Sequence, residues 1–169
     1  MVLVEGPTEA LALPVYLAAC DCDTKELGIA VIPVHGKGSM ARYIRLFEAY
    51  GIPTYSVFDN DPDDDGNGNK RKEIIETYGD AFDVNMLQSD VLTVNEKFAV
   101  FGKDFETSLR KQLLGYEEKE QKVKETFGPA KPLVAREVAL LLTKEETTAD
   151  SWQPIKTMAA QIAKLLKKP

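Results

Sequence analysis

The residues best suited to chemistry in this sequence are carboxylates that directly follow short apolar runs. Glu5 follows the apolar run 2–4, and Asp59 and Asp61 follow the apolar run 55–58. A carboxylate at the end of a buried strand is destabilising unless it is paired, solvated or bound to a metal. Because sites in open α/β sheets form beyond the carboxyl ends of the strands, we expect these acids to meet there. Oxygen ligands of this kind suit Mg²⁺ or Mn²⁺, so the pattern predicts a divalent-metal site.

Three further acids extend this prediction. Glu9 lies one helical turn beyond Glu5, and Asp104 and Glu106 follow the run 97–101, which is apolar after Lys97. If these groups join the others, the cluster has enough carboxylates for two ions. Two such ions can stabilise both the attacking and the leaving oxygen of a phosphodiester. The chain has one histidine, so a histidine-rich zinc or copper site is not expected.

The acidic loop that follows Asp59 leaves alternatives open. Residues 61–66 also begin like an EF-hand calcium loop, Asp-x-Asp-x-Asp-Gly. That interpretation is weakened because Lys72 occupies the twelfth position, where such a loop needs Glu, and because the segment before the loop is a predicted strand rather than a helix. Within the interpretation as a magnesium or manganese site, Asp63 is the reserve ligand that would replace Asp59 or Asp61.

Hydrophobic periodicity predicts an α/β fold in which strands and helices alternate over the first hundred residues. The predicted strands are 2–4, 29–34 and 54–58, with weaker candidates at 84–87 and 97–101. The predicted helices begin near Pro7, with later ones at 40–50, 70–78, 104–114, 116–126, 132–143 and 152–167. The alternation favours a parallel sheet that is covered on both faces. We therefore expect an α/β core at 1–102 and a helical part at 103–169 that completes the same domain.

The net charge of −6 is distributed unevenly along the chain. Residues 1–101 contain 8 basic and 17 acidic residues, net −9, whereas residues 102–169 contain 13 basic and 10 acidic residues, net +3. The first part therefore suits cations, and the second suits contact with a polyanion. A turn is expected at 36–39, where Lys37 would face the nucleic-acid backbone. No run approaches the roughly 20 apolar residues that span a membrane, so a cytoplasmic protein with no membrane contact is expected.

Two motifs resemble those of a known family. Residues 3–10 read LVEGPTEA and residues 57–61 read VFDND. An apolar strand ending in Glu-Gly, followed later by a strand ending in Asp-x-Asp, resembles the Toprim domain, and the first motif is similar to that of the overcoming-lysogenization-defect (OLD) family nucleases. The resemblance implies a Toprim-like, Rossmann-like parallel sheet flanked by helices, with additional C-terminal helices. It also implies a DNA endonuclease that hydrolyses phosphodiesters with two Mg²⁺ or Mn²⁺ ions.

The resemblance also implies roles for particular residues. Lys131-Pro132 is similar to the family segment with a lysine that stabilises the transition state, so the implied catalytic residues are Glu5, Asp59 and Lys131. The implied metal ligands are Glu5, Asp59 and Asp61 for one ion and Glu9, Asp104 and Glu106 for the other.

Family members usually have an ATPase domain before the Toprim part. This sequence has no Gly-x-x-x-x-Gly-Lys-Ser/Thr phosphate loop, so it does not itself contain that ATPase domain. We therefore expect the sequence to be a fragment of a longer chain that also contains the ATPase domain. Two alternatives remain: a non-catalytic module that binds metal or nucleic acid, and a calcium-binding loop protein. A nuclease is expected to require Mg²⁺ or Mn²⁺, whereas an EF-hand-type site is expected to select Ca²⁺.

Overall fold

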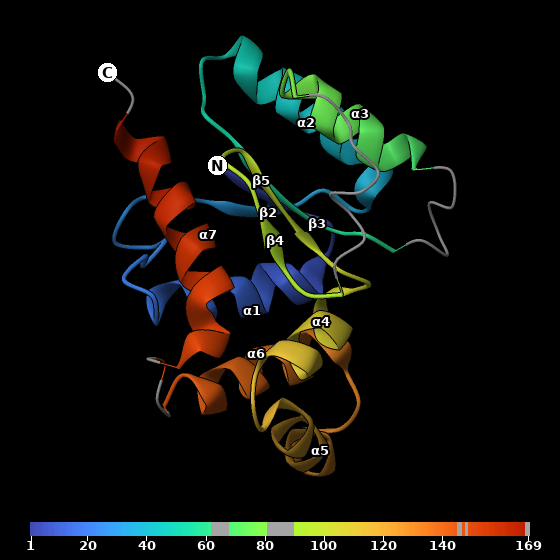
Figure 1. Ribbon diagram of the computed structural model, residues 1–169, viewed down its shortest axis with the longest axis vertical. Helices are drawn as coiled ribbons and strands as arrows, with labels where there is room; N and C mark the ends of the chain where they lie inside the picture. The colour runs from blue at the N-terminus through green and yellow to red at the C-terminus, as the bar shows by residue number, and fades with distance from the viewer. Residues whose placement is uncertain (62–67, 81–89, 145–146, 148, 168–169) are drawn as a thin grey trace.

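The computed structural model describes residues 1–61, 68–80, 90–144, 147 and 149–167. Its centre is a five-stranded sheet with the order β2-β1-β3-β5-β4 (Figure 1). The strands are β1 (Val2–Val4), β2 (Val31–Pro33), β3 (Tyr55–Asp59), β4 (Thr93–Val94) and β5 (Phe98–Phe101). The first four in the spatial order pair in parallel, and β4 pairs antiparallel with β5 at the edge. The fold is therefore α/β with a mainly parallel sheet, as the sequence predicts.

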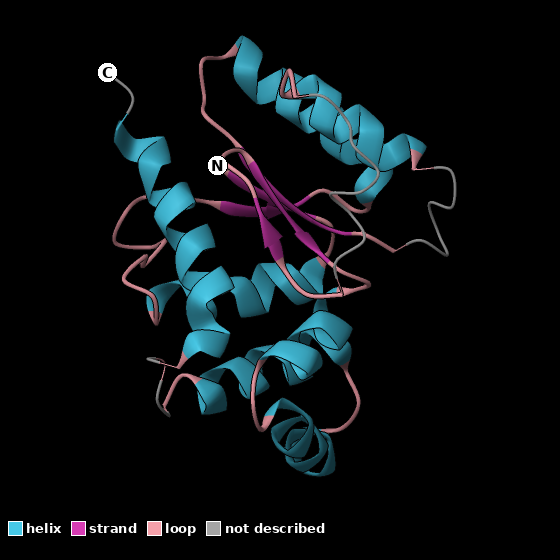
Figure 2. Ribbon diagram, in the orientation of Figure 1, coloured by secondary structure: helices cyan, strands magenta, loops and turns pink. Residues whose placement is uncertain are grey.

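Helices cover both faces of this sheet (Figure 2). On one face lie α2 (Lys37–Ala49) and α3 (Asn69–Thr77). The other layer consists of α1 (Pro7–Ala18), α4 (Phe105–Gln112), α5 (Tyr116–Phe127), α6 (Lys131–Leu142) and α7 (Gln153–Ala163), with 3₁₀ turns at Asp150–Trp152 and Lys164–Lys167. None of the helices in the described part of the chain is long and apolar enough to cross a membrane.

The central position of β1 explains its uninterrupted apolar sequence. Val2 and Val4 belong to the core on the α1 side, whereas Leu3 belongs to the core beneath α2 and α3. Side chains alternate between the two faces of a strand, so a parallel strand that is covered on both faces needs apolar residues at every position. All three side chains are fully buried. The first polar side chain after the strand, Glu5, therefore lies just beyond the covered region.

The larger of the two cores joins the N-terminal helix to the C-terminal helices. Tyr16 of α1 contacts Phe105 and Trp152, with ring centroids 6.3 and 5.9 Å apart respectively. Both α6 and α7 also contact α1. This packing fixes α4 and α6, which bear Glu106 and Lys131, relative to the strands. The division of the chain at residue 102 remains a prediction.

The structure differs from the predicted elements at several points. The prediction of a turn at 36–39 is wrong, because α2 already begins at Lys37. Gly36 is the N-cap of this helix, with φ 108°. The strand β4 was not predicted, because two residues give too short an apolar pattern to recognise. The candidate strand 84–87 lies outside the described residues, and β2 is shorter than the predicted 29–34.

Candidate metal centre

Glu5 and Asp59 lie together because β1 and β3 are parallel neighbours that end at the same edge of the sheet. Glu5 directly follows β1, and its Oε1 accepts a 3.0 Å hydrogen bond from the backbone N–H of Asp59, the last residue of β3. On its other side β3 pairs with β5, where Asp59 is in register with Phe101. Asp104 follows β5 and begins α4. Three adjacent strands thus direct acidic residues to one edge.

The carboxyl group of Asp59 is held in an unfavourable environment. Its Oδ1 is shielded from solvent and has no hydrogen-bond partner among the described residues. Burial raises its pKa well above the ordinary range, and the negative charges of Glu9 and Glu5 raise it further. Asp104 acts in the same direction, whereas the positive charge of Lys37 lowers the pKa. A buried carboxylate oxygen with no donor destabilises the protein, and a cation would remove that cost.

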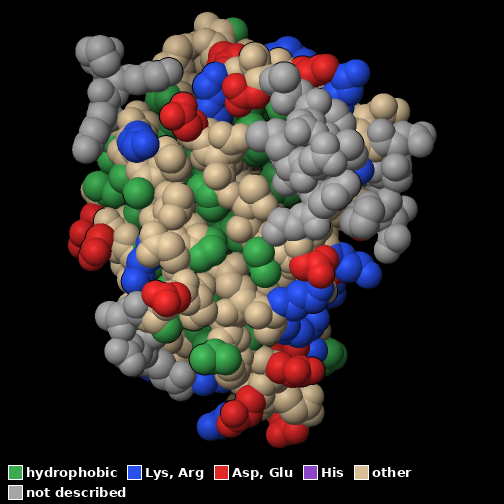
Figure 3. Space-filling model, in the orientation of Figure 1, with side chains coloured by type: hydrophobic (Ala, Val, Ile, Leu, Met, Phe, Trp, Pro, Cys, Tyr) green, Lys and Arg blue, Asp and Glu red, His purple; other side chains and the backbone are tan. Residues whose placement is uncertain are grey.

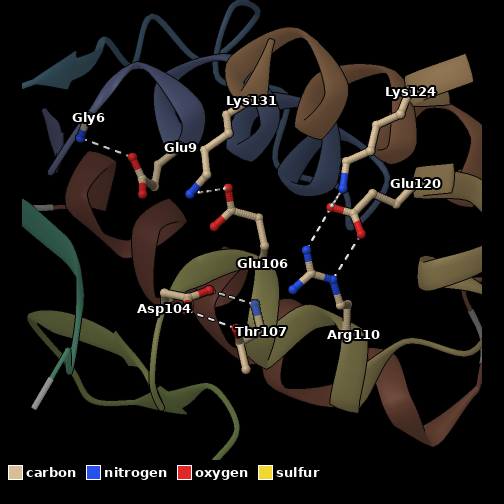
Figure 4. Close-up of polar contacts among 9 residues, drawn as sticks. All are labelled: Gly6, Glu9, Asp104, Glu106, Thr107, Arg110, Glu120, Lys124 and Lys131. Atoms are coloured by element: carbon tan, nitrogen blue, oxygen red, sulfur yellow. Dashed lines mark hydrogen bonds and ion pairs between the residues drawn. The ribbon is translucent and has the colours of Figure 1, made fainter. Parts of the chain in front are cut away.

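Glu9 lies in the first turn of α1 and is almost fully buried. Its Oε2 accepts a 2.9 Å hydrogen bond from the backbone N–H of Gly6, which satisfies one of the free donors at the helix start. Burial raises the pKa of Glu9, and nearby Glu106 raises it further, whereas Lys131 lowers it. In Figure 4, Lys131 is directed toward Glu106, whereas the Glu9 carboxylate is directed toward Gly6; Glu9 nevertheless lies within electrostatic range of both Glu106 and Lys131. The structure therefore brings Glu9 to the same site as these two residues.

Glu106 and Lys131 form an ion pair between α4 and α6, with 3.6 Å between Lys131 Nζ and Glu106 Oε1. The Glu106 side chain is 13% exposed, whereas that of Lys131 is 79% exposed. Lys131 is the first residue of α6, so its long side chain extends from the helix end over the acidic cluster. The exposed ammonium group of Lys131 can therefore contact a ligand that approaches from solvent, while the backbone of α6 stays fixed.

Asp104 also has a structural role, because its side chain accepts hydrogen bonds from Thr107. Its Oδ1 accepts a 2.7 Å hydrogen bond from the backbone N–H of Thr107, and its Oδ2 accepts a 2.8 Å bond from Thr107 Oγ1 (Figure 4). Asp104 is thus the N-cap of α4. Both carboxylate oxygens keep further lone pairs, so this capping is compatible with an additional cation. An Asp directly before a helix is a sequence signal that could have identified this cap.

Asp61 lies at the end of the described segment that follows β3. Its backbone has a left-handed conformation, with φ 37°, and its N–H donates a 2.7 Å hydrogen bond to the carbonyl oxygen of Lys103. This bond ties the loop after β3 to the loop after β5. The negative charge of Asp61 raises the pKa of Glu5, so the two carboxylates lie within electrostatic range. The reserve ligand Asp63 and the rest of the candidate EF-hand loop at 62–67 lie outside the described residues.

Lys37 is buried beside Glu5, a position that the sequence did not predict. Its side chain is only 2% exposed, so it does not face a nucleic-acid backbone as expected. Instead its Nζ lies 3.6 Å from Glu5 Oε1 and has no hydrogen-bond partner among the described residues. Gly36 leads α2 to this place by donating its backbone N–H to the carbonyl oxygen of Glu5, at 2.9 Å. The first polar residue beyond β2 is His35, so the rule that selected Glu5, a polar residue just beyond a parallel strand, does not select Lys37.

The first part of the chain, which contains Glu5, Glu9, Asp59 and Asp61, is similar to a known protein family. Residues 1–61 match a family model described as the overcoming lysogenization defect protein-like TOPRIM domain. Residues 1–61 are therefore similar to an OLD-like Toprim domain. No curated protein matches the chain significantly.

Solved structures extend the likeness beyond residue 61, to nearly the whole length of the chain. The C-terminal region of the Xanthomonas campestris pv. campestris OLD protein is 16% identical, with a TM-score of 0.67 over 98% of this chain and 95% of that one. The C-terminal region of the Burkholderia pseudomallei OLD protein is 21% identical, with a TM-score of 0.58 over 98% of this chain and 93% of that one. At these identities the likeness shows a shared fold, including the helices beyond residue 61.

The donor set at this edge of the sheet fits Mg²⁺ or Mn²⁺, because it consists of carboxylate oxygens that include the Oδ1 of Asp59, which has no partner among the described residues. Within the described ranges, however, no three acidic, histidine or cysteine side chains converge closely enough to hold an ion. The acids share an electrostatic neighbourhood without yet pointing at a common centre. A bound ion would therefore require side-chain rotations, for which Glu9 and Glu106 have contacts that can be exchanged for metal bonds.

Proposed function

We propose that this OLD-like Toprim domain is a nuclease that hydrolyses DNA phosphodiesters and depends on Mg²⁺ or Mn²⁺. The match of residues 1–61 to a Toprim family model supports a metal-binding function of the nuclease type. The observation that carries the proposal is the buried, unpartnered Oδ1 of Asp59 among the charges of Glu5, Glu9 and Asp104. Such a concentration of negative charge is costly without a cation and has a clear use with one.

The proposed ligands divide into two sets according to their places in the fold. Glu5, Asp59 and Asp61 lie at the ends of β1 and β3 and would hold one ion. Glu9, Asp104 and Glu106 lie at the starts of α1 and α4 and would hold the second. When bound, two such ions stabilise the charge that develops on the attacking and leaving oxygens of a phosphodiester.

The remaining work falls to two lysines with contrasting environments. Lys131 is exposed and extends over Glu106, so we assign it to the developing negative charge on the phosphate. Lys37 is buried beside Glu5 and is out of reach of a substrate in solvent. Its proposed part is to hold Glu5 in place and to offset the negative charge of the cluster.

The biological setting follows from the same family. The two OLD structures are C-terminal regions of their proteins, and this chain matches them over nearly their whole length. We propose that an ATPase domain lies on the same full-length chain and that the protein acts on DNA in the cytoplasm.

Plasmid cleavage by the 169-residue chain tests the proposal. The assay compares Mg²⁺, Mn²⁺, Ca²⁺ and EDTA for the wild type, Glu5→Gln, Lys131→Ala and the control Glu73→Gln, which removes an exposed acid of α3. We expect cleavage with Mg²⁺ or Mn²⁺ in the wild type and in Glu73→Gln. We expect no cleavage in Glu5→Gln, and a rate about 10²–10³-fold lower in Lys131→Ala because a donor to the transition state is lost. Folded wild type that cleaves DNA with none of these metals would contradict the proposal and favour the non-catalytic binding module.

A further inference from the structure

A small cavity opens beside the candidate metal centre, between α4, α5 and α6. Its volume is about 140 Å³, several times the roughly 30 Å³ that a water molecule occupies in the liquid. Its charged lining residues are Asp104, Glu106, Arg110, Glu120, Lys124 and Lys131. It shares Asp104, Glu106 and Lys131 with the proposed catalytic centre, so a group bound here would adjoin a substrate bound there.

Arg110 is held in one orientation on the wall of this cavity. Its Nε donates to Glu120 Oε2 at 2.9 Å, and its Nη2 donates to Glu120 Oε1 at 2.7 Å. Such a two-bond pairing fixes the plane of the guanidinium group. The remaining nitrogen, Nη1, points away from Glu120 and toward the side of Glu106 in Figure 4. Glu120 therefore occupies one edge of the guanidinium group and leaves the N–H groups of Nη1 available to the cavity.

The balance of charge on this wall is positive. Lys124 Nζ lies 3.0 Å from Glu120 Oε1, so two cations share a single carboxylate. Lys131 is the third cation of the lining, which with Asp104 and Glu106 contains three cations and three carboxylates. On the face drawn in Figure 3, Lys and Arg side chains also gather over the region of α4. With ions bound to Asp104 and Glu106, the cavity would present a surplus of positive charge to an anion.

We propose that this cavity binds a backbone phosphate of the nucleic acid next to the phosphate that is cleaved. Arg110 Nη1 and the ammonium group of Lys124 are the donors, and Glu120 is a positioning residue that fixes the guanidinium plane. A planar fork with free N–H groups is the geometry that recognises phosphate oxygens. The site extends the proposed nuclease function, on which it rests, by assigning the path of the strand along α4 and α5.

Binding of a fluorescein-labelled DNA duplex to the 169-residue chain tests the site without any cleavage step. Fluorescence anisotropy is measured in Ca²⁺ at several salt concentrations for Arg110→Gln, Lys124→Gln and Glu120→Gln. Arg45→Gln is the matched control, because Arg45 forms a similar 2.8 Å ion pair with Glu73 between α2 and α3, far from the cavity. Lys124→Gln leaves the Arg110–Glu120 pair intact, so it reports on the site even if Arg110→Gln loses stability.

Each of Arg110→Gln and Lys124→Gln is expected to weaken binding about tenfold, as for the loss of one charge-assisted hydrogen bond. Each should also reduce the slope of log K against log salt by about 0.9. Glu120→Gln adds positive charge yet is expected to weaken binding, because the guanidinium is released. Unchanged or stronger binding in Glu120→Gln would overturn its positioning role. Equal affinity and salt slope in Lys124→Gln, Arg45→Gln and the wild type, or no DNA binding by folded wild type, would overturn the site, whether or not the chain cleaves DNA.

Discussion

The backbone N–H of Asp59 donates a 3.0 Å hydrogen bond to Oε1 of Glu5, which lies 54 positions earlier in the chain. The bond exists because β1 and β3 are adjacent and parallel, so that the residue after one meets the last residue of the other. It fixes one oxygen of Glu5 against the sheet before any ion is bound. The neighbouring carboxyl group of Asp59 receives no such support at Oδ1 from the described residues. The site is therefore held in place by backbone geometry at the expense of electrostatic stability.

Asp59→Asn is predicted to raise the melting temperature of the metal-free protein while it abolishes metal-dependent function. The substitution removes a buried carboxyl group whose ionised form is disfavoured by burial and by the negative charges of Glu9 and Glu5. Each kcal/mol recovered corresponds to about 2–4 °C for a domain of this size. Differential scanning fluorimetry in EDTA and in Mn²⁺ measures both effects. A lower melting temperature in EDTA would show that the Asp59 carboxylate stabilises the fold.

The metal-free protein is predicted to lose stability as the pH rises above the ordinary carboxyl range of about 4. Burial raises the pKa values of Glu5, Glu9 and Asp59, so the folded state keeps protons that the unfolded state has already released. The free energy of unfolding therefore decreases with pH until these raised pKa values are passed. Stabilisation by Mn²⁺ should increase over the same interval, because the ion competes with the protons.

Melting temperatures at pH 5 and pH 7 in EDTA check this prediction. The comparison is between the wild type and Asp59→Asn, because other groups, such as Glu120 with its lowered pKa, contribute equally to both proteins. The wild type should lose more stability between the two values than the variant. An identical pH dependence would show that Asp59 keeps the same charge in the folded and unfolded states.

Lys37→Met is predicted to destabilise the metal-free protein by about 3 kcal/mol, the range for breaking a buried ion pair. It removes the cation that lies 3.6 Å from Glu5 and leaves the acidic cluster uncompensated. Mn²⁺ should restore much of the loss by supplying positive charge. The control Lys72→Met removes an exposed partner of Glu76 and should change stability by less than about 0.5 kcal/mol. Urea unfolding of both variants, with and without Mn²⁺, tests this, and equal losses would contradict it.

Two substitutions of Asp104 separate its capping role from its proposed metal role. Asp104→Ala removes the bonds to Thr107 and is predicted to cost about 1 kcal/mol of stability. Asp104→Ser keeps an N-cap acceptor and should cost little, yet it removes the carboxylate. If Asp104 is a metal ligand, both variants lose plasmid cleavage. Full cleavage by Asp104→Ser would instead make Asp104 a helix cap alone.

The parts of the fold and site that follow from sequence are those with strong local patterns. The run at β1 is apolar throughout and the run at β3 is apolar except for Ser56, which predicts buried parallel strands and places Glu5 and Asp59 at their ends. The structure brings Glu9, Asp104 and Glu106 to the same edge, where Lys131 joins them. Their predicted roles as ligands remain predictions.

What sequence could not supply depends on contacts between distant segments. The burial of Lys37 arises because the start of α2 lies against the end of β1, and its own neighbours are two glycines and a serine typical of a turn. The pairing of Arg110 with Glu120 likewise depends on how α4 and α5 pack. The strand β4 is recognisable only through its pairing with β5.

The most direct test of the central claim is a Mn²⁺ titration followed by electron paramagnetic resonance of the free ion. Wild type and the control Glu73→Gln should each bind two ions per chain, and Asp59→Asn should lose at least one of them. If all three proteins bind the same number of Mn²⁺ ions, or if none of them binds Mn²⁺, the assignment of the metal centre to these carboxylates is contradicted.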